Sequence, residues 1–229
     1  MTDPADAQRA LVLSRVRRAL GRGTPDPAAA APAGDAVDAR IGHPRANTIP
    51  LRAQLQQPQL GELFDEMVRA SAATLARVPA LDALPDAVAA WRAEQGIEGE
   101  VVLAPESPLG ELPWRDELPV ERRLIRSGDA VSVSSAAVGV AETGTLLLCS
   151  GPENPVSANF LPENQVVVVR SADLVGSPED AWARLRERGP LPRTVNWITG
   201  PSRSGDIEMT MLMGAHGPVR LHVVLVEEG

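Results

Sequence analysis

The sequence predicts a layered α/β protein with a largely parallel sheet and flanking helices. After residue 100, short apolar runs alternate with stretches of helical period, which is typical of strand–helix–strand units. The run QVVVV at 165–169 is unbroken and β-branched, and this favours a strand covered on both faces. Hydrophobic residues occupy 44% of the 229 positions, enough to fill the core of one sizeable domain.

The N-terminal segment 1–22 is expected to carry a helix of its own, over residues 3–20. Asp3 can cap this helix, Pro4 suits its first position and Gly21 is a plausible stop. One stripe of the helix is apolar and comprises Leu13, Val16 and Leu20.

An Ala/Pro-rich linker is expected at 23–50, followed by the α/β domain at 51–229. Residues 23–39 are mostly Ala, Pro, Gly and Asp, so they have few large apolar side chains to pack. We therefore expect 23–39 to be disordered or extended, and the first helix to pack away from the domain or on a second chain.

The helices of the domain are predicted from periodicity and from start signals. The clearest helix, 59–78, has apolar residues at three- and four-residue steps, and Ser177 with Pro178 marks the start of another. The expected helices are 59–78, 85–96, 178–188 and 207–215.

The strands are predicted from short apolar or β-branched runs bounded by turn residues. A turn at 141–144 separates two of these runs. The expected strands are 100–105, 130–140, 145–150, 165–169, 195–199 and 219–226.

Composition argues against several kinds of function. The net charge of −8 argues against nucleic-acid binding, and all 22 basic residues are arginine, so lysine chemistry is excluded. Cys149 is the single cysteine, and no cysteine or carboxylate cluster has metal-ligand spacing, so no metal site and no cofactor are predicted. No segment has the length of apolar sequence that a membrane span needs, and the N-terminus lacks the order of a signal peptide. We expect a cytoplasmic protein.

The richest candidate site is the segment 200–208, between a predicted strand and a predicted helix. Free N–H groups at such a helix start, with serine hydroxyls and an arginine fork, suit a small anion. A capped helix start explains the same residues, and spacing alone favours that simpler interpretation. The candidate ligand-binding residues here are Gly200, Ser202, Arg203, Ser204, Gly205, Asp206 and Glu208.

Two further segments carry candidate residues. Glu142 is the candidate catalytic residue, as a base, a nucleophile or an anchor, with Thr143 and Gly144 beside it; a plain polar turn is the alternative. His216 lies between glycines and could bind an anion or cap a helix end. The hypothesis is that these residues share one pocket with Ser202 and its neighbours, because carboxyl ends of parallel strands meet at one sheet edge.

Several segments together resemble lactate-utilisation protein C, a family of LUD-domain proteins. The run 195–226 resembles its C-terminal signature, from Val-Asn-aromatic-Ile-Thr-Gly-Pro-Ser to Gly-x-His-Gly-Pro. AETGTLLL at 141–148 and FLP at 160–162 match a Glu-Thr-Gly-Thr and a Leu-Pro element, and RRALGR at 17–22 resembles the N-terminal helix. The match is dense over 130–226.

The resemblance implies a fold like the sugar-phosphate isomerase and CoA-transferase superfamily. It also implies a role in oxidising L-lactate to pyruvate beside an iron–sulfur protein and a cysteine-rich subunit. The competing class is a stand-alone enzyme or binding protein for a small phosphorylated or acyl-CoA ligand, and assay of the purified protein separates the two.

Overall fold

The computed structural model describes residues 4–21, 27–43, 47–204 and 212–227. The chain divides into two units, Met1–Thr48 and Ile49–Gly229. Within the described ranges, no helix combines the length and the apolar character that a bilayer crossing needs.

The first unit contains two helices, α1 (Pro4–Ala19) and α2 (Pro27–Gly42). Helix α1 confirms the helix expected over 3–20. The expectation of a disordered or extended linker is wrong over 27–39, because α2 covers these residues. Alanine has the highest intrinsic helix propensity and proline suits a first helical position, so this composition forms a helix without large apolar side chains.

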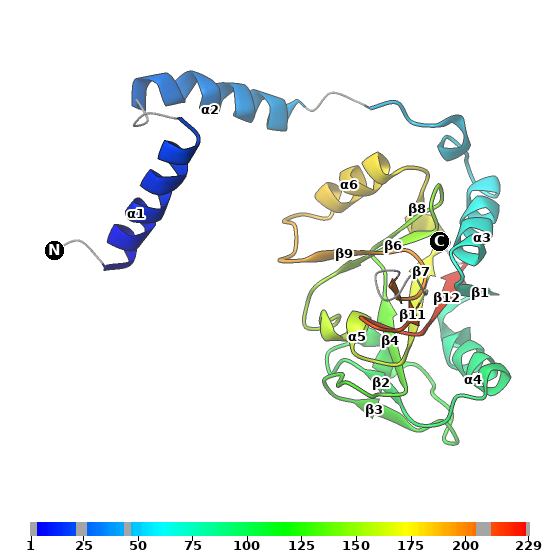
Figure 1. The fold of residues 1–229 in the computed structure, drawn as a ribbon. Coiled ribbons are helices and arrows are strands. Elements are labelled where there is room, and N and C mark those ends of the chain that lie inside the picture. The colour runs from blue at the N-terminus through cyan, green and yellow to red at the C-terminus, as the bar shows by residue number, and fades with distance from the viewer. Residues whose placement is uncertain (1–3, 22–26, 44–46, 205–211, 228–229) are drawn as a thin grey trace. The chain divides into compact units, whose positions relative to one another are not determined.

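The second unit is built on a six-stranded parallel sheet in the order β1-β12-β7-β4-β2-β3, which confirms the predicted α/β class (Figure 1). Strand β7 has the β-branched run of the sequence at its centre and is paired on both sides. The strands are β1 (Thr74–Val78), β2 (Val101–Leu103), β3 (Val120–Arg122), β4 (Val131–Ser135), β7 (Asn164–Arg170) and β12 (Arg220–Val226).

A smaller sheet has the order β8-β5-β6-β9, in which β6 runs antiparallel to both β5 and β9. Strands β5 and β9 therefore point the same way, and their carboxyl ends share one edge. The strands are β5 (Val138–Val140), β6 (Thr145–Cys149), β8 (Leu174–Val175) and β9 (Val195–Ile198).

The single strand expected over 130–140 is instead two strands in different sheets. Ala136 N donates to Val168 O of the large sheet, and Ala137 N donates to Leu147 O of the small sheet, at 2.8 Å each. The chain thus changes sheets between two adjacent alanines. Nearly all residues from 131 to 141 are buried, so the burial pattern contains no break that would mark the change.

The elements form four layers, and apolar clusters fill the spaces between them. Helix α4 (Leu84–Gln95) covers one face of the large sheet through Leu84, Val88 and Trp91. Helix α3 (Gln59–Ala70) and the small sheet cover the other face. Helix α6 (Pro178–Glu187) packs on the outer face of the small sheet. The short helices are α5 (Ser157–Phe160), η1 (Leu51–Ala53), η2 (Leu81–Ala83), η3 (Pro108–Glu111) and η4 (Ser171–Asp173).

The helix expected over 59–78 is too long. Helix α3 ends at Ala70, and β1 begins at Thr74. The chain turns between them at Ala72, which has a φ of +66°. No glycine or proline marks this stop, so the apolar period of the sequence runs on into the strand. The helix expected over 178–188 is confirmed, with Ser177 in a capping box with Asp180.

A buried histidine links β12 to α4 and β1. The ring of His222 stacks on Trp91, with centroids 4.8 Å apart and planes at 11°. Its Nδ1 lies 2.7 Å from Thr74 Oγ1, and its buried Nε2 has no hydrogen-bond partner among the described residues. Burial, with a smaller contribution from the charge of Arg69, lowers the pKa of His222 from 6.5 to about 4. The imidazole is therefore neutral at physiological pH.

Candidate functional site

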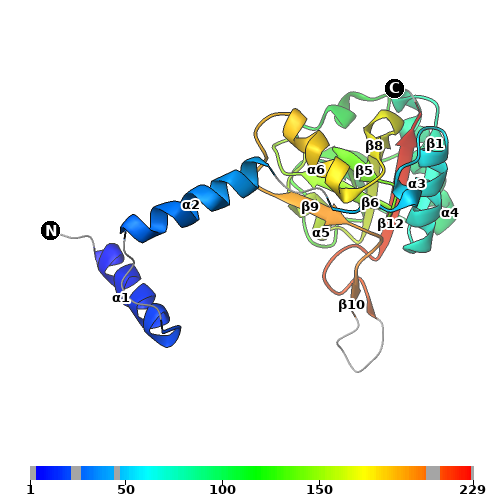
Figure 2. The ribbon, with the colours of Figure 1, turned by 90° about the horizontal axis from the view of Figure 1, so that it is seen from above.

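The segment after β9 forms one arm of a β-hairpin that leads back into β12. Strand β10 (Arg203–Ser204) pairs antiparallel with β11 (Leu212–Met213). Figure 2 shows this hairpin extending beyond the two sheets at the end where β9 leaves and β12 enters. The site is therefore carried by a turn that connects one sheet to the other.

The helix expected over 207–215 is wrong where the structure describes it, because Leu212 and Met213 are in a strand. Ser204 therefore lies in strand β10, and no helix begins at Ser202 or Ser204 in the described part of the chain. Three candidates, Gly205, Asp206 and Glu208, lie outside the described residues.

The hairpin brings Ser202 and His216 together, whereas a helix would have kept them about 15 Å apart. Gly214 N donates to Ser202 O, and Ser202 N donates to Pro218 O, at 2.9 Å each. His216 N donates to Ser202 Oγ at 3.3 Å. Two candidates far apart in the sequence thus belong to one local structure.

Gly200 lets the chain turn into this structure next to the end of α3. Its φ is +72°, which favours glycine, and it follows Thr199 directly after β9. A β-carbon at Gly200 would lie 2.2 Å from the carbonyl oxygen of Ser71. Glycine is therefore required by both conformation and space.

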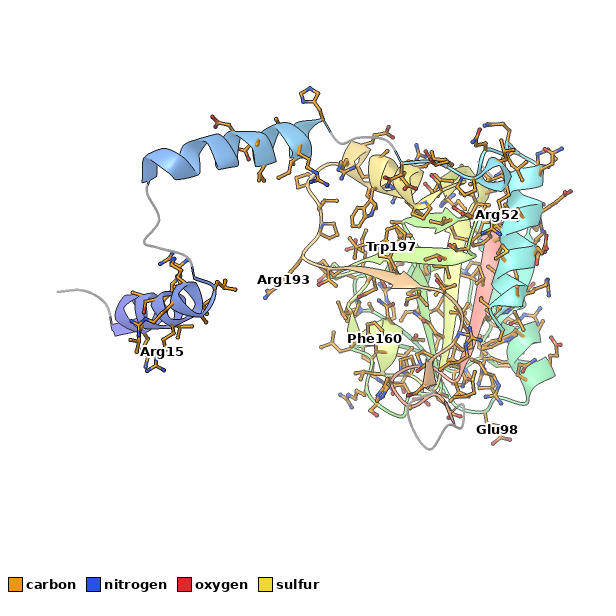
Figure 3. All side chains as sticks on the ribbon, turned by 45° about the horizontal axis from the view of Figure 1, so that its top comes forward. Arg15, Arg52, Glu98, Phe160, Arg193 and Trp197 are labelled. Carbon is orange, nitrogen blue, oxygen red and sulfur yellow. The ribbon has the colours of Figure 1, made fainter. Side chains whose placement is uncertain are left out.

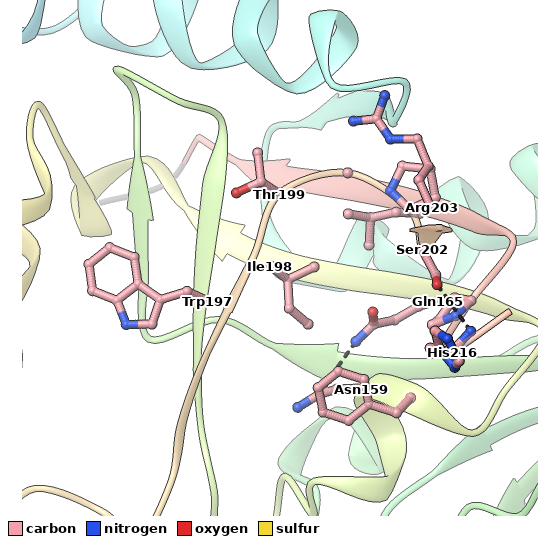
Figure 4. A pocket seen from close by; sticks show the side chains of 14 residues that line it. Asn159, Gln165, Trp197, Ile198, Thr199, Ser202, Arg203 and His216 are labelled. Atoms are coloured by element: carbon pink, nitrogen blue, oxygen red, sulfur yellow. Dashed lines mark hydrogen bonds between the residues drawn. The ribbon is translucent and has the colours of Figure 1, made fainter. Parts of the chain in front are cut away.

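A cavity of about 240 Å³ opens beside the hairpin (Figure 4). Its walls come from the end of β9, the hairpin, the start of β12, the start of β7 and helix α5. The residues that line it are Asn159, Phe160, Gln165, Trp197, Ile198, Thr199, Gly200, Pro201, Ser202, Arg203, His216, Gly217, Pro218 and Leu221.

Two buried carboxamides form the inner polar wall of the cavity. Gln165 of β7 is 1% exposed and Asn159 of α5 is 2% exposed. Gln165 Nε2 donates to Asn159 Oδ1 at 3.0 Å and lies 3.4 Å from Ser134 Oγ of β4 (Figure 4). A buried amide costs free energy unless it is hydrogen-bonded, so this pairing fixes both side chains.

Neither carboxamide is among the site residues predicted from the sequence. Gln165 falls in the predicted strand 165–169, and Asn159 falls outside every predicted helix and strand. A signal was available, because Gln165 is a polar residue that opens a run of valines buried on both faces. A polar side chain in such a run must find a partner or face a cavity.

The outer rim of the cavity carries the groups that can be positively charged. The side chains of Arg203 and His216 are both exposed. Arg203 forms no ion pair with a carboxylate in the described part of the chain. Arginine offers a planar fork of donors that matches a carboxylate.

The turn that holds Glu142, Thr143 and Gly144 lies at the same edge of the small sheet. Thr145 Oγ1 is 2.6 Å from Thr143 Oγ1 and 2.7 Å from Thr199 Oγ1, so a chain of hydroxyls joins this turn to the end of β9. Gly144 has a φ of +65°, and a β-carbon there would be 2.6 Å from the backbone of α3.

Glu142 itself is not among the residues that line the cavity. Its side chain is 13% exposed and its Oε1 lies 3.5 Å from Arg52 Nη2. Figure 3 shows Arg52 well separated from Phe160 of the cavity wall. The structure thus brings Glu142 to the predicted edge but pairs it with an arginine outside the cavity.

The fold and the site together define a class of protein. It has a parallel sheet and a smaller mixed sheet in contact, with a small cavity of mixed polar and apolar lining where β9 leads through a hairpin into β12. No three His, Cys, Asp or Glu side chains cluster in a way that could hold a metal ion, as far as the structure describes the chain. Residues 120–226, which build most of this arrangement, match the LUD domain.

Two relatives that match about three quarters of the chain identify the family within this class. Lactate utilization protein C of Geobacillus kaustophilus is 30% identical over 196 residues, which cover 75% of this chain and 77% of that protein. Lactate utilization protein C of Deinococcus radiodurans is 30% identical over 184 residues, 77% and 84% of the two chains. The chain therefore belongs to the lactate utilization protein C family of LUD-domain proteins.

A solved structure agrees with the fold. The crystal structure of a DUF162 family protein from Deinococcus radiodurans superposes with a TM-score of 0.56 at 22% identity. The superposition covers 75% of this chain and 99% of the other. This likeness supports the architecture of the second unit and carries no information on chemistry.

Proposed function

We propose that the protein is a component of L-lactate utilisation that supports the oxidation of L-lactate to pyruvate together with iron–sulfur and cysteine-rich partner subunits. The observation that carries this proposal is the position of the cavity. It is built mostly by residues within 120–226, the part of the chain that matches the LUD domain. Relatives with 30% identity over most of the chain have the name lactate utilization protein C.

The composition of the chain supports a division of labour with partner subunits. An iron–sulfur cluster is usually held by four thiolates, and this chain has one cysteine. Cys149 is half-buried, and burial raises its pKa above the ordinary value, so it is a poor thiolate. The electrons from lactate would therefore pass to a cluster on another subunit.

The dimensions of the cavity support a small carboxylate as its ligand. Pockets for drug-sized ligands occupy about 300 to 1,000 Å³. A cavity of about 240 Å³ is smaller and suits a molecule of a few heavy atoms. An acyl-CoA ester would extend far beyond it, so the size of the cavity favours lactate over an acyl-CoA ligand but does not separate lactate from a small phosphorylated ligand.

Reconstitution tests the role in lactate oxidation. The chain should be combined with the purified iron–sulfur and cysteine-rich subunits, and L-lactate-dependent reduction of a dye followed. We expect oxidation by the complete mixture and none by this chain alone. Equal rates without this chain, or turnover of L-lactate by this chain alone, would overturn the proposal.

Charge removal at the rim tests ligand binding. The variant Arg203→Gln is expected to weaken binding of L-lactate about tenfold, because a charge-assisted hydrogen bond contributes about 1.5 to 3 kcal/mol when it is well formed. Titration calorimetry measures the change. The exposed Arg193, which does not line the cavity, provides the control Arg193→Gln, and this variant should bind like the unmodified protein. If both variants bind L-lactate equally weakly, the effect comes from the overall charge of the protein and not from a contact of Arg203 with the ligand.

A further inference from the structure

The carboxamide pair Gln165–Asn159 is only partly satisfied by the protein. The two side chains share one hydrogen bond, and Gln165 Nε2 is also close to Ser134 Oγ. No hydrogen bond of Gln165 Oε1 or Asn159 Nδ2 is found among the described residues, and neither is among the fully buried side-chain atoms that lack a partner, so both atoms reach the cavity. Both residues line the cavity, and both are at least 98% buried. Polar atoms in the wall of such a cavity are completed by a ligand or by water.

The free atoms of the pair are complementary to each other in type. Gln165 presents a carbonyl oxygen, which is an acceptor, and Asn159 presents an amide group, which is a donor. If both amides were rotated by 180°, the two residues would exchange roles and still offer one acceptor and one donor. A ligand that replaces water at both atoms must therefore be able to donate and to accept within a few ångströms.

The surroundings hold the pair in place. Gln165 extends from β7, which is paired on both sides in the middle of the large sheet. Asn159 is in α5, and the carbonyl of its neighbour Ala158 accepts a 2.8 Å hydrogen bond from Ser132 Oγ of β4. Fixed polar groups discriminate between ligands better than mobile ones, because they cannot relax around a ligand that lacks a partner group.

We propose that the Gln165–Asn159 pair is the specificity-determining element of the cavity and selects a 2-hydroxy acid over the corresponding 2-oxo acid. This inference rests on the proposed function, in which the cavity binds a small carboxylate. The hydroxyl of a 2-hydroxy acid donates to the free carbonyl oxygen, and an oxygen of the same ligand accepts from the free amide. A 2-oxo acid has no donor at that carbon, so its ketone oxygen would face the carbonyl oxygen of the pair.

Selection of the reduced form would favour release of the oxidised product. A ligand that loses its hydroxyl hydrogen on oxidation also loses its bond to the carbonyl of the pair. The cavity then binds the oxidised product less tightly than the reduced substrate, so the product dissociates more readily after the reaction. The pair itself exchanges no proton with the ligand in this scheme; it recognises the reduced form.

The test compares sodium L-lactate with sodium pyruvate as probes of the purified full chain. Dissociation constants are measured by titration calorimetry or by ligand-observed NMR. We expect L-lactate to bind at least about tenfold more tightly, since an unpaired buried polar group costs about 1 to 3 kcal/mol. In Gln165→Met, which keeps the length of the side chain but removes its polar atoms, the preference should fall to within about threefold. Gln54→Met makes the same chemical change on an exposed residue outside the cavity and should leave the preference intact.

The outcomes separate this inference from the proposed function. Equal affinities for the two probes in the unmodified protein would overturn the inference and leave a carboxylate-binding cavity. An unchanged preference in Gln165→Met would also overturn it, because another group would then be the selector. Binding of neither probe would overturn the ligand class of the proposed function itself. If Gln165→Met does not fold, the comparison of probes in the unmodified protein still decides.

Discussion

Replacing Gly200 by alanine is expected to destabilise the protein by about 3 kcal/mol or more. A left-handed backbone costs a residue with a β-carbon about 1 to 2 kcal/mol, and overpacking adds about 1 to 3 kcal/mol. Both terms apply, because Gly200 has a φ of +72° and its β-carbon would lie 2.2 Å from Ser71 O. Urea unfolding followed by circular dichroism measures the loss. Loss of ligand binding should accompany it, since Gly200 lines the cavity.

Gly96 supplies a matched control for this substitution. It ends α4 with a φ of +61°, and a β-carbon there would meet no atom within 4 Å. Gly96→Ala therefore introduces only the free-energy cost of a left-handed backbone, and we expect the free energy of unfolding to fall by about 1 kcal/mol. The difference between the two variants isolates the close approach of Ser71. Equal losses would mean that the end of α3 moves aside at little cost.

Acidification from pH 6.5 to pH 4 is expected to remove about 3 kcal/mol of stability through His222. In the unfolded chain the imidazole takes a proton near pH 6.5, but burial lowers the pKa of His222 in the folded protein to about 4. Between these values the unfolded state binds more protons, so stability falls as the pH falls. Each pKa unit corresponds to about 1.4 kcal/mol. The pKa values of Asp129 and Asp86 are held below 3.8 mainly by Arg123 and Arg115, so those carboxyls titrate below this window.

Two variants distinguish His222 from other titrating groups. His222→Phe keeps an aromatic ring against Trp91 and removes the titration, so its stability should change less between pH 6.5 and pH 4. His216→Gln removes an exposed histidine and should keep the pH dependence of the unmodified protein. Thermal unfolding at several pH values measures both. The assignment fails if His222→Phe shows the same pH dependence as the unmodified protein.

Four strands of the large sheet, β2, β4, β7 and β12, were predictable because their sequences are apolar or β-branched, whereas β1 was predicted as part of a helix and β3 was not predicted. Strand β7 is paired on both sides and buried on both faces, so apolar β-branched residues are favoured at all its central positions. Predicting this strand therefore requires no information from residues distant in the sequence. The capping box at Ser177 was predictable for a similar reason, since the cap and its partner are three residues apart.

The hairpin was not predicted because two local signals compete there. Ile207 to Met211 alternates apolar and polar residues, which is the period of a strand, while methionine and leucine favour a helix. In the described part of the chain, Arg203 pairs with Met213, so these residues form strands and not a helix. A shared pocket for Ser202 and His216 was part of the sequence hypothesis, but the approach of Gln165 to them could not be predicted, because it depends on the position of β7 beside β12.

The place of β12 in the large sheet has a consequence for how the protein reaches its native state. Among the described strands of this sheet, β1 pairs with β12 alone. The contact between Thr74 and His222, which is 148 residues further along the chain, can therefore form only after β12 has been synthesised. Contacts of such long sequence separation close large loops and slow folding. During synthesis β1 would be exposed as an unpaired edge until β12 becomes available, and an exposed edge strand invites aggregation. A truncation that removes residues 220–226 should therefore yield aggregates instead of a smaller folded domain.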